Sequence, residues 1–155
     1  AMSILAFQKQ RPGLLRQGVE VIATDLSSEM LNKCSQGLYD ELSLARGLSP
    51  QRRAMFFQPH ESGQMQVKPE VRKMVSFRSL NLLTSYAALG RFDIVFCRNV
   101  LIYFSADVKQ KILQQIAGQL QPAGVLFLGA SESISAASDT YAMIKCNPGL
   151  YYQKK

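Results

Sequence analysis

Polar side chains that could bind a nucleoside follow several apolar runs of this chain. Asp25 closes the run 19–26, Asn81 lies in the run 75–83, and Arg98 and Asn99 follow the run 92–97. In open α/β sheets, ligands bind beyond the carboxyl ends of the strands. A carboxylate at that edge can accept hydrogen bonds from both hydroxyls of a ribose, and an amide can pair with the edge of an adenine ring. If the runs are neighbouring parallel strands, we expect these residues to share one nucleoside site.

Each of these residues also has a purely structural explanation. Asp25 could instead cap the following helix or close a turn, and Asn81 could be a turn asparagine next to Leu82, whose backbone could also pair with adenine. Packing would account for the apolar Val100, Leu101, Ile102 and Phe104. It does not account for Arg98 and Asn99, which would need hydrogen-bond partners if they were buried.

The elements that would position these residues alternate between strands and helices. The strands are expected at 19–26, 75–83, 92–97 and 125–128, and the helices at 2–10, 28–36 and 106–120. Ser27 and Gly37 are typical start and stop residues of a helix, and Ser105 is expected to cap the longest helix, which Pro122-Ala123-Gly124 ends. The apolar residues of that helix lie on one side: Val108, Ile112, Leu113, Ile116 and Leu120.

Two segments depart from this alternation. Residues 38–74 contain a helix start at Ser49-Pro50 and a hairpin over 56–67 with its turn at 60–63. The chain then closes with an antiparallel hairpin of 143–146 and 150–153, joined by Asn147-Pro148-Gly149. The pattern predicts an α/β fold with a mostly parallel sheet, right-handed crossovers, and Asp25, Asn81, Arg98 and Asn99 at one edge.

Composition argues against several classes of protein. Of 155 residues, 47% are hydrophobic, yet no run of 18 apolar residues predicts a membrane-spanning helix, and the first residues lack the layout of a signal peptide. Cys34, Cys97 and Cys146 form no CxxC pair, and His60 is the only histidine, so we expect neither a disulfide framework nor a metal site. Buried, reduced thiols and a cytoplasmic location are the resulting expectations.

The net charge of +7 is concentrated in one segment. Between residues 46 and 78 only Glu61 and Glu70 oppose seven basic residues, which leaves +5. The basic residues are Arg46, Arg52, Arg53, Lys68, Arg72, Lys73 and Arg78. A nucleic-acid surface would interleave aromatic residues, but only Phe56 and Phe57 are near and they are expected in the core, so no nucleic acid is predicted. The segment either steers an acidic protein partner or is a solvated face.

Four motifs, in order and at family-like spacing, resemble those of the chemotaxis-receptor methyltransferases, which are protein-glutamate O-methyltransferases. FCRNVLIYF at 96–104 is similar to the signature of that family. The others are VIATDLSSEML at 21–31, SFRSLNLL at 76–83 and LQPAGVLFLGASESI at 120–134. ELSLARGLSPQRRAMFF at 41–57 and VKPEVRKMVSF at 67–77 resemble its inserted β-subdomain.

The resemblance implies a fold and a reaction. The fold is α/β, a Rossmann-like class I AdoMet-dependent methyltransferase sheet with a small inserted β-subdomain at about 45–74 and a terminal antiparallel hairpin. Residues 1–155 would be part of the catalytic domain. The reaction moves a methyl group from S-adenosylmethionine to glutamate side chains of methyl-accepting chemotaxis receptors and leaves S-adenosylhomocysteine.

The resemblance also implies roles for matching residues. Asp25 holds the ribose hydroxyls, Asn81 and Leu82 hold the adenine, and Arg98 and Asn99 line the cofactor site. Tyr103, the catalytic candidate, lies near the transferable methyl group and orients the reacting groups without acting as a base. The inserted subdomain docks receptors.

In the resembled family, a first strand and its glycine-rich loop precede the helix that contains Met2 and lie between the strands at 19–26 and 92–97. None of this is in the 155 residues. We therefore expect an N-terminal truncation, weak or absent binding of S-adenosylmethionine, and two unpaired strand edges. Those strands would close on each other, or a second copy would fill the gap as a homodimer.

Two other functions remain open at this point. A non-catalytic relative could retain only receptor docking or self-association. A different Rossmann-like enzyme is the other alternative, and the segment 97–104 argues against it.

Overall fold

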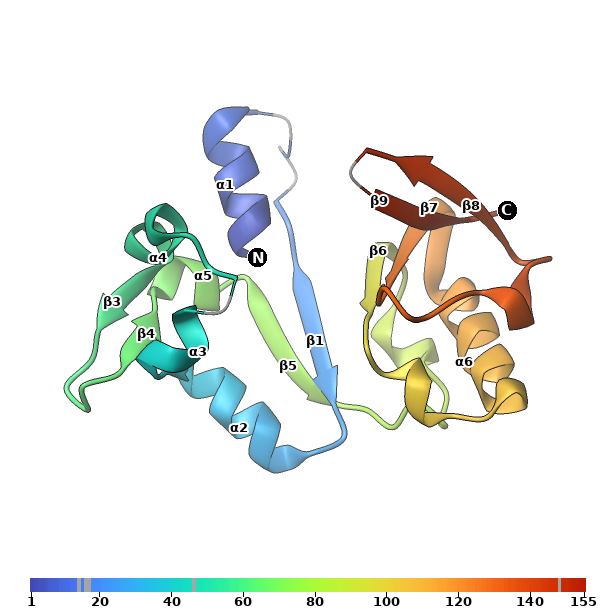
Figure 1. Ribbon diagram of the computed structural model, residues 1–155, viewed down its shortest axis with the longest axis horizontal. Helices are drawn as coiled ribbons and strands as arrows, with labels where there is room; N and C mark the ends of the chain where they lie inside the picture. The colour runs from blue at the N-terminus through green and yellow to red at the C-terminus, as the bar shows by residue number, and fades with distance from the viewer. Residues whose placement is uncertain (14, 16–17, 46, 148) are drawn as a thin grey trace. The chain divides into compact units, whose positions relative to one another are not determined.

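The computed structural model describes residues 1–13, 15, 18–45, 47–147 and 149–155. It divides into two compact units, an N-terminal unit (Ala1–Asn81) and a C-terminal unit (Leu82–Lys155), which are described in turn (Figure 1). Arg46 of the basic segment and Pro148 of the terminal hairpin lie outside the described residues. No helix of the described residues is both long and apolar enough to cross a membrane.

A parallel pair of strands forms one part of the N-terminal unit. β1 (Val21–Asp25) pairs with β5 (Val75–Ser79) in register, from Val21 opposite Val75 to Asp25 opposite Ser79. Both strands are shorter than the apolar runs that predicted them. Their carboxyl ends therefore lie at the same edge, where Asp25 is the last residue of β1.

The helix after β1 has the ends that its sequence predicted. α2 (Ser28–Gln36) begins after Ser27, whose hydroxyl accepts a hydrogen bond from the N–H of Met30 at 3.2 Å. It ends at Gly37, which has a left-handed φ of 64°. That conformation is easy for glycine and unfavourable for residues with a side chain, so the stop at Gly37 is a local property of the sequence.

A three-stranded antiparallel sheet forms the second part of this unit, in the order β2-β4-β3. Its strands are β2 (Leu38–Tyr39), β3 (Phe57–Pro59) and β4 (Met65–Val67), and its helices are α3 (Glu41–Ala45), α4 (Pro50–Phe56) and α5 (Pro69–Arg72). The predicted cap at Ser49 is confirmed, because its hydroxyl accepts from the N–H of Arg52 at 3.3 Å. The predicted hairpin is confirmed too, with the N–H of His60 donating to the carbonyl of Gln64 at 2.9 Å.

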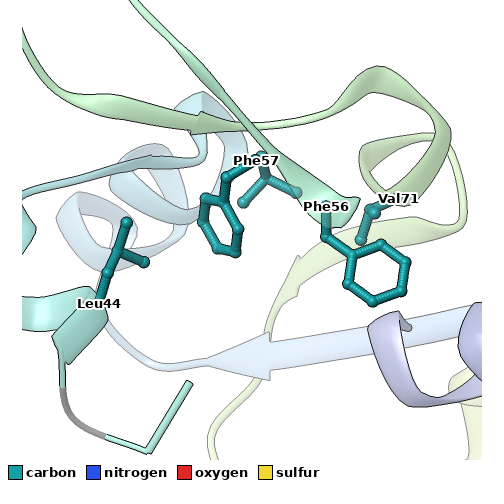
Figure 2. Close-up of a cluster of buried hydrophobic side chains, with 5 residues drawn as sticks. Leu44, Phe56, Phe57 and Val71 are labelled. Carbon is teal, nitrogen blue, oxygen red and sulfur yellow. The ribbon is translucent and has the colours of Figure 1, made fainter. Parts of the chain in front are cut away.

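A cluster of buried apolar side chains holds this unit together (Figure 2). Its members come from α3, α4 and α5 and from the two strands of the hairpin: Leu44, Phe56, Phe57, Val67 and Val71. Side chains of α1 (Met2–Gln10) pack against it, among them Met2 and Leu5. Burial of this apolar area is the main term that stabilises these short elements, since helices and strands of this length are marginal alone.

The C-terminal unit is built on a four-stranded sheet in the order β6-β7-β9-β8. β6 (Phe92–Cys97) and β7 (Leu120–Leu128) are parallel, whereas β9 (Gly149–Lys154) pairs antiparallel with both β7 and β8 (Tyr141–Cys146). The terminal antiparallel hairpin is therefore confirmed. One crossover, which contains a helix, connects the parallel strands (Figure 1).

The crossover helix α6 (Ala106–Gln119) buries most of the side that the sequence predicted, although Val108 is only half-buried and Leu120 already belongs to β7. Ile112, Leu113, Ile116 and Ala117 are buried, and the buried hydroxyl of Tyr141 donates to the carbonyl of Leu113 at 2.7 Å. Ser105 occupies the N-cap position of the helix, as predicted, but its side chain makes no capping hydrogen bond.

One further prediction is corrected. Pro122-Ala123-Gly124 lies inside β7, not between helix and strand, as a bulge in which Ala123 has a φ of 61° and the register with β6 shifts between Phe92 and Ile94. The described strands form three sheets: the parallel pair β1-β5, the small antiparallel sheet β2-β4-β3, and the sheet that contains the parallel pair β6-β7. Asp25 ends β1 in the N-terminal unit, and Arg98 and Asn99 directly follow β6 in the C-terminal unit.

Candidate functional site

Asp25 and the segment before Asn81 lie together at the carboxyl ends of β1 and β5. The N–H of Leu80 donates to the backbone carbonyl of Asp25 at 3.0 Å, which ties the two strand ends together. The exposed side chain of Asp25 accepts a hydrogen bond from the N–H of Ser27 at 2.8 Å through Oδ1. Asp25 thus serves the turn into α2, and a carboxylate retains further lone pairs that can accept hydroxyl groups. The two explanations of Asp25 are compatible.

Leu82 has its backbone carbonyl engaged inside the C-terminal unit. The hydroxyl of the buried Tyr86 donates to that carbonyl. Burial, and then the nearby Cys97, raise the pKa of Tyr86 to about 12, so its hydroxyl stays protonated as a donor. Pairing of the Leu82 backbone with an adenine edge would therefore use its N–H.

Arg98, Asn99 and Tyr103 lie on the loop that follows β6, within the C-terminal unit. Arg98 and Asn99 are exposed, so the argument that they need buried partners does not apply. The 3-10 helix η2 (Leu101–Tyr103) anchors the loop through Leu101, which is 1% exposed, and presents Tyr103, which is 81% exposed. Packing was predicted to account for Ile102, but its side chain is 46% exposed, so that prediction was wrong.

Glu132, which the sequence did not single out, organises this loop. Its Oε2 accepts from the N–H groups of Asn99 and Gly129, each at 2.7 Å. Its Oε1 accepts from the N–H groups of Val100 at 2.9 Å and Leu101 at 2.7 Å. Glu132 comes from the segment after β7, so one carboxylate binds the loops that follow two neighbouring parallel strands.

Opposing effects set the pKa of Glu132. Partial burial raises it, but the hydrogen bonds from the backbone N–H groups of Asn99, Gly129, Leu101 and Val100 together outweigh burial. The net pKa is lower than usual, because each of those bonds favours the charged form. Glu132 is therefore ionised at neutral pH.

The side chains of Asn99 and Glu132 occupy the space beside Gly129 that a side chain there would need. A Cβ there would overlap Asn99 Oδ1 and would lie 2.6 Å from Glu132 Oε2. Asn99 itself has a φ of 59°, a left-handed conformation that asparagine tolerates better than most residues. Asn99, Gly129 and Glu132 thus fit one another closely. The only signal in the sequence was a glutamate shortly after a buried strand.

The three cysteines are unpaired, as expected, but only one is buried. Cys97 is buried, Cys34 is half-buried and Cys146 is exposed, so the prediction of three buried thiols was wrong for Cys146. Burial, and then the negative charge of Glu132, raise the pKa of Cys97 to about 11. Its thiol is therefore protonated and a poor nucleophile at neutral pH.

Several cations of the basic segment are used inside the N-terminal unit. Arg53 forms an ion pair with Glu41. Lys68 Nζ donates to the carbonyls of Ala54 and Met55 at 2.9 Å each, and the guanidinium of Arg72 donates to the carbonyl of Ser35 at 2.9 Å. Such bonds satisfy carbonyls near the ends of α4 and α2.

The remaining described cations of this segment are Arg52, Lys73 and Arg78. They are exposed, and no ion pair or side-chain hydrogen bond is formed by them within the described residues. The charge that a partner could meet is therefore smaller than the sequence suggested.

Comparisons with known proteins agree with this architecture. Residues 1–150 match the family model described as CheR methyltransferase, SAM binding domain. Chemotaxis protein methyltransferase 1 of Vibrio cholerae serotype O1 is 54% identical over 155 residues, which are 100% of this chain and 56% of that protein. Chemotaxis protein methyltransferase Cher2 of Pseudomonas putida is 53% identical, with the same coverage.

A more distant relative and a solved structure extend the comparison. Chemotaxis protein methyltransferase of Escherichia coli K12 is 40% identical over 121 residues, covering 75% of this chain and 42% of that protein. The crystal structure of magnesium protoporphyrin IX methyltransferase from Synechocystis PCC 6803 with bound SAM has a TM-score of 0.52 at 15% identity, covering 99% of this chain and 76% of that one. The chain spans 56% of the length of the Vibrio cholerae relative.

Proposed function

This chain belongs to the CheR methyltransferase family, whose SAM-binding domain it matches over residues 1–150, and from that premise we propose that it binds S-adenosylmethionine. We propose further that it carries this part of an enzyme that methylates glutamate side chains of methyl-accepting chemotaxis receptors. The observation that supports the proposal most strongly is the family match over nearly the whole chain.

The residues at the strand ends suit a nucleoside. Asp25 provides an exposed carboxylate; Leu26, the next residue in the chain, is 67% exposed, and Leu83, which follows Leu82, is 58% exposed. An adenosyl group offers hydroxyls to a carboxylate and an apolar ring face to such side chains. In our proposal Asp25 holds the ribose hydroxyls, while Asn81 and the N–H of Leu82 hold the adenine.

The loop after β6 would position the reacting groups. S-adenosylmethionine would supply a methyl group bound to a sulfonium. As the oxygen–carbon bond of the methyl ester forms, the carbon–sulfur bond would break and leave S-adenosylhomocysteine. A glutamate side chain, with an ordinary pKa of about 4.3, is already ionised at neutral pH and needs no general base. Arg98 and Asn99 would line the cofactor site, and the exposed Tyr103 would orient the carboxylate. Catalysis would come from alignment and exclusion of water.

We also propose that the inserted subdomain, about residues 45–74, docks the receptor. Its support is the exposed charge of Arg52 and Lys73, which suits an acidic protein surface. Receptor methylation would occur in the cytoplasm, where the three unpaired cysteines would stay reduced. The curated relatives are named as methyltransferases, and no observation favours the alternative of a non-catalytic docking module.

A homodimer is a separate part of the proposal. β1 pairs only with β5, and β6 pairs only with β7, within the described residues, so each has an edge at which a strand of a second copy could add. Light scattering after size exclusion would show a dimer mass if this holds, and a monomer at all concentrations would contradict it.

Methyl transfer can be tested in a chimera in which residues 1–155 replace the matching part of the Vibrio cholerae relative. The chimera is incubated with S-adenosylmethionine labelled in the methyl group and with receptor-bearing membranes from a strain that lacks its own methyltransferase. A glutamate methyl ester releases volatile labelled methanol in base. Absence of base-labile label in the receptor would overturn the proposed reaction.

Cofactor binding is measured separately, by calorimetric titration of the chain and of the chimera with S-adenosylhomocysteine. Weak or absent binding is expected for the 155-residue chain by itself. Binding by the chimera alone would agree with this and would mean that the site needs residues beyond these 155. Binding by neither protein would contradict the assignment of the cofactor.

A further inference from the structure

We propose that Glu132 is the positioning residue for the loop that carries Arg98, Asn99 and Tyr103. The inference rests on the proposed function for its catalytic consequence. Its structural part concerns only the C-terminal unit and stands without that function.

A single carboxylate satisfies a whole row of backbone donors. Three consecutive N–H groups, those of Asn99, Val100 and Leu101, point at Glu132, and Gly129 adds a fourth from the other loop. Consecutive N–H groups that converge in this way form a concave anion site. Here the anion is the protein's own side chain, so the function of the arrangement is to fix the loop.

The chemistry of the arrangement needs a carboxylate. Its two oxygens offer about four acceptor sites, which equals the number of donors that meet it. Hydrogen bonds to an ionised acceptor are roughly twice as strong as neutral ones. A glutamine in the same place would turn an NH₂ group toward two of the N–H donors, so half of the bonds would become repulsive contacts.

The position of Glu132 links it to Tyr103. Leu101 is both a donor to Glu132 and the buried anchor of η2, and Tyr103 stands two residues later on the same turn. Tyr103 is 81% exposed, so its direction depends on the backbone beneath it more than on side-chain packing. Displacing residues 99–101 would therefore displace Tyr103. A misplacement of about 1 Å can cost about 100-fold in rate.

The first test follows the loop itself. The chain contains no tryptophan, so Tyr103→Trp introduces a single fluorescent probe at the position of interest. In this background, Glu132→Gln should lower the fluorescence anisotropy of the probe and speed amide exchange at Val100 and Leu101. Glu132→Asp, which keeps the charge, should restore part of both signals. Unchanged anisotropy and exchange would overturn the inference, whether or not the protein methylates anything.

The second test separates positioning from mere stability in the active chimera. Glu132→Gln should lower kcat by about tenfold or more. The Kd for S-adenosylhomocysteine should rise as well, because Arg98 and Asn99, proposed to line the cofactor site, lie on the same loop. The same substitution should have much less effect on kcat when Tyr103 is already phenylalanine, because both changes act through one group. Tyr141→Phe, which removes a buried hydrogen bond to Leu113 elsewhere in the unit, is the control that lowers Tm and leaves kcat unchanged.

The outcomes distinguish the two proposals. If the parent chimera transfers no methyl group, the proposed function is wrong. The anisotropy and amide-exchange results then decide by themselves whether Glu132 positions the loop. If the parent is active and Glu132→Gln keeps its kcat, or lowers kcat equally with and without the Tyr103 hydroxyl, the positioning role is wrong.

Discussion

Asp25 and Ser27 are joined by a 2.8 Å hydrogen bond from the N–H of Ser27 to Oδ1 of Asp25, so the candidate ribose ligand also closes the turn into α2. Asp25→Asn keeps one side-chain oxygen for this turn and loses the charge that favours two hydroxyl partners. We expect near-native stability and a loss of S-adenosylhomocysteine affinity of about 1.5–3 kcal/mol, the range for hydrogen bonds to a charged group. Calorimetry in the chimera measures it.

Ser27→Ala is the matched control for this experiment. It removes the hydroxyl that accepts a hydrogen bond from the N–H of Met30 at the start of α2. It should cost about 1 kcal/mol of stability and leave ligand affinity unchanged. If Asp25→Asn leaves the affinity for S-adenosylhomocysteine unchanged, Asp25 only closes the turn into α2 and does not bind the ribose.

Charge reversal in the N-terminal unit should separate docking cations from structural ones. Arg52→Glu and Lys73→Glu change exposed charges and should slow association with receptor membranes in low salt, with little change in Tm. Arg72→Glu should instead lower Tm, because it removes the donor to the carbonyl of Ser35. Association rates and melting curves are the measurements.

Lys111→Glu, on the exposed side of α6, gives the same change in net charge outside the basic segment. If it slows association as much as Arg52→Glu does, the effect reflects net charge and the segment is only a solvated face.

The stability of the C-terminal unit should depend on the ionisation of Glu132. Since the pKa of Glu132 is lower in the folded protein than in the unfolded chain, its contribution is fully present above about pH 4.3. It is lost as pH falls through the folded pKa, because the proton then binds both states. Urea unfolding should show a deficit for Glu132→Gln at pH 7 that shrinks at pH 3. A deficit independent of pH would show that the charge does not matter.

The cysteines should differ in reactivity toward a thiol reagent. Exposed Cys146 should react fastest, half-buried Cys34 more slowly, and Cys97 only on unfolding, because burial and the charge of Glu132 disfavour its thiolate. Cys146→Ser should remove the fast phase alone. Rapid labelling of Cys97 in the folded protein would contradict the packing of β6.

The chain's local signals predicted its local structure well. Ser27 and Gly37 bound α2, Ser49 and Pro50 start α4, and the residues around His60 turn a hairpin. These features depend on backbone conformation and hydrogen bonds within a few residues, so the residue types suffice to predict them. The motif FCRNVLIYF pointed by resemblance to the family that the comparisons show.

Contacts between segments distant in sequence could not be predicted in the same way. Whether Lys68 and Arg72 meet solvent or a helix end depends on how the hairpin packs on α4 and α2. Glu132 reaches Asn99, 33 residues away, only because Cys97 and Leu128 end neighbouring parallel strands in register. Its partners are backbone N–H groups, which every residue except proline has. No pattern of side chains could therefore predict which of them bind Glu132. The sequence thus determined the helices, turns and family of this protein, and the tertiary structure decided which carboxylate fixes the loop of the candidate site.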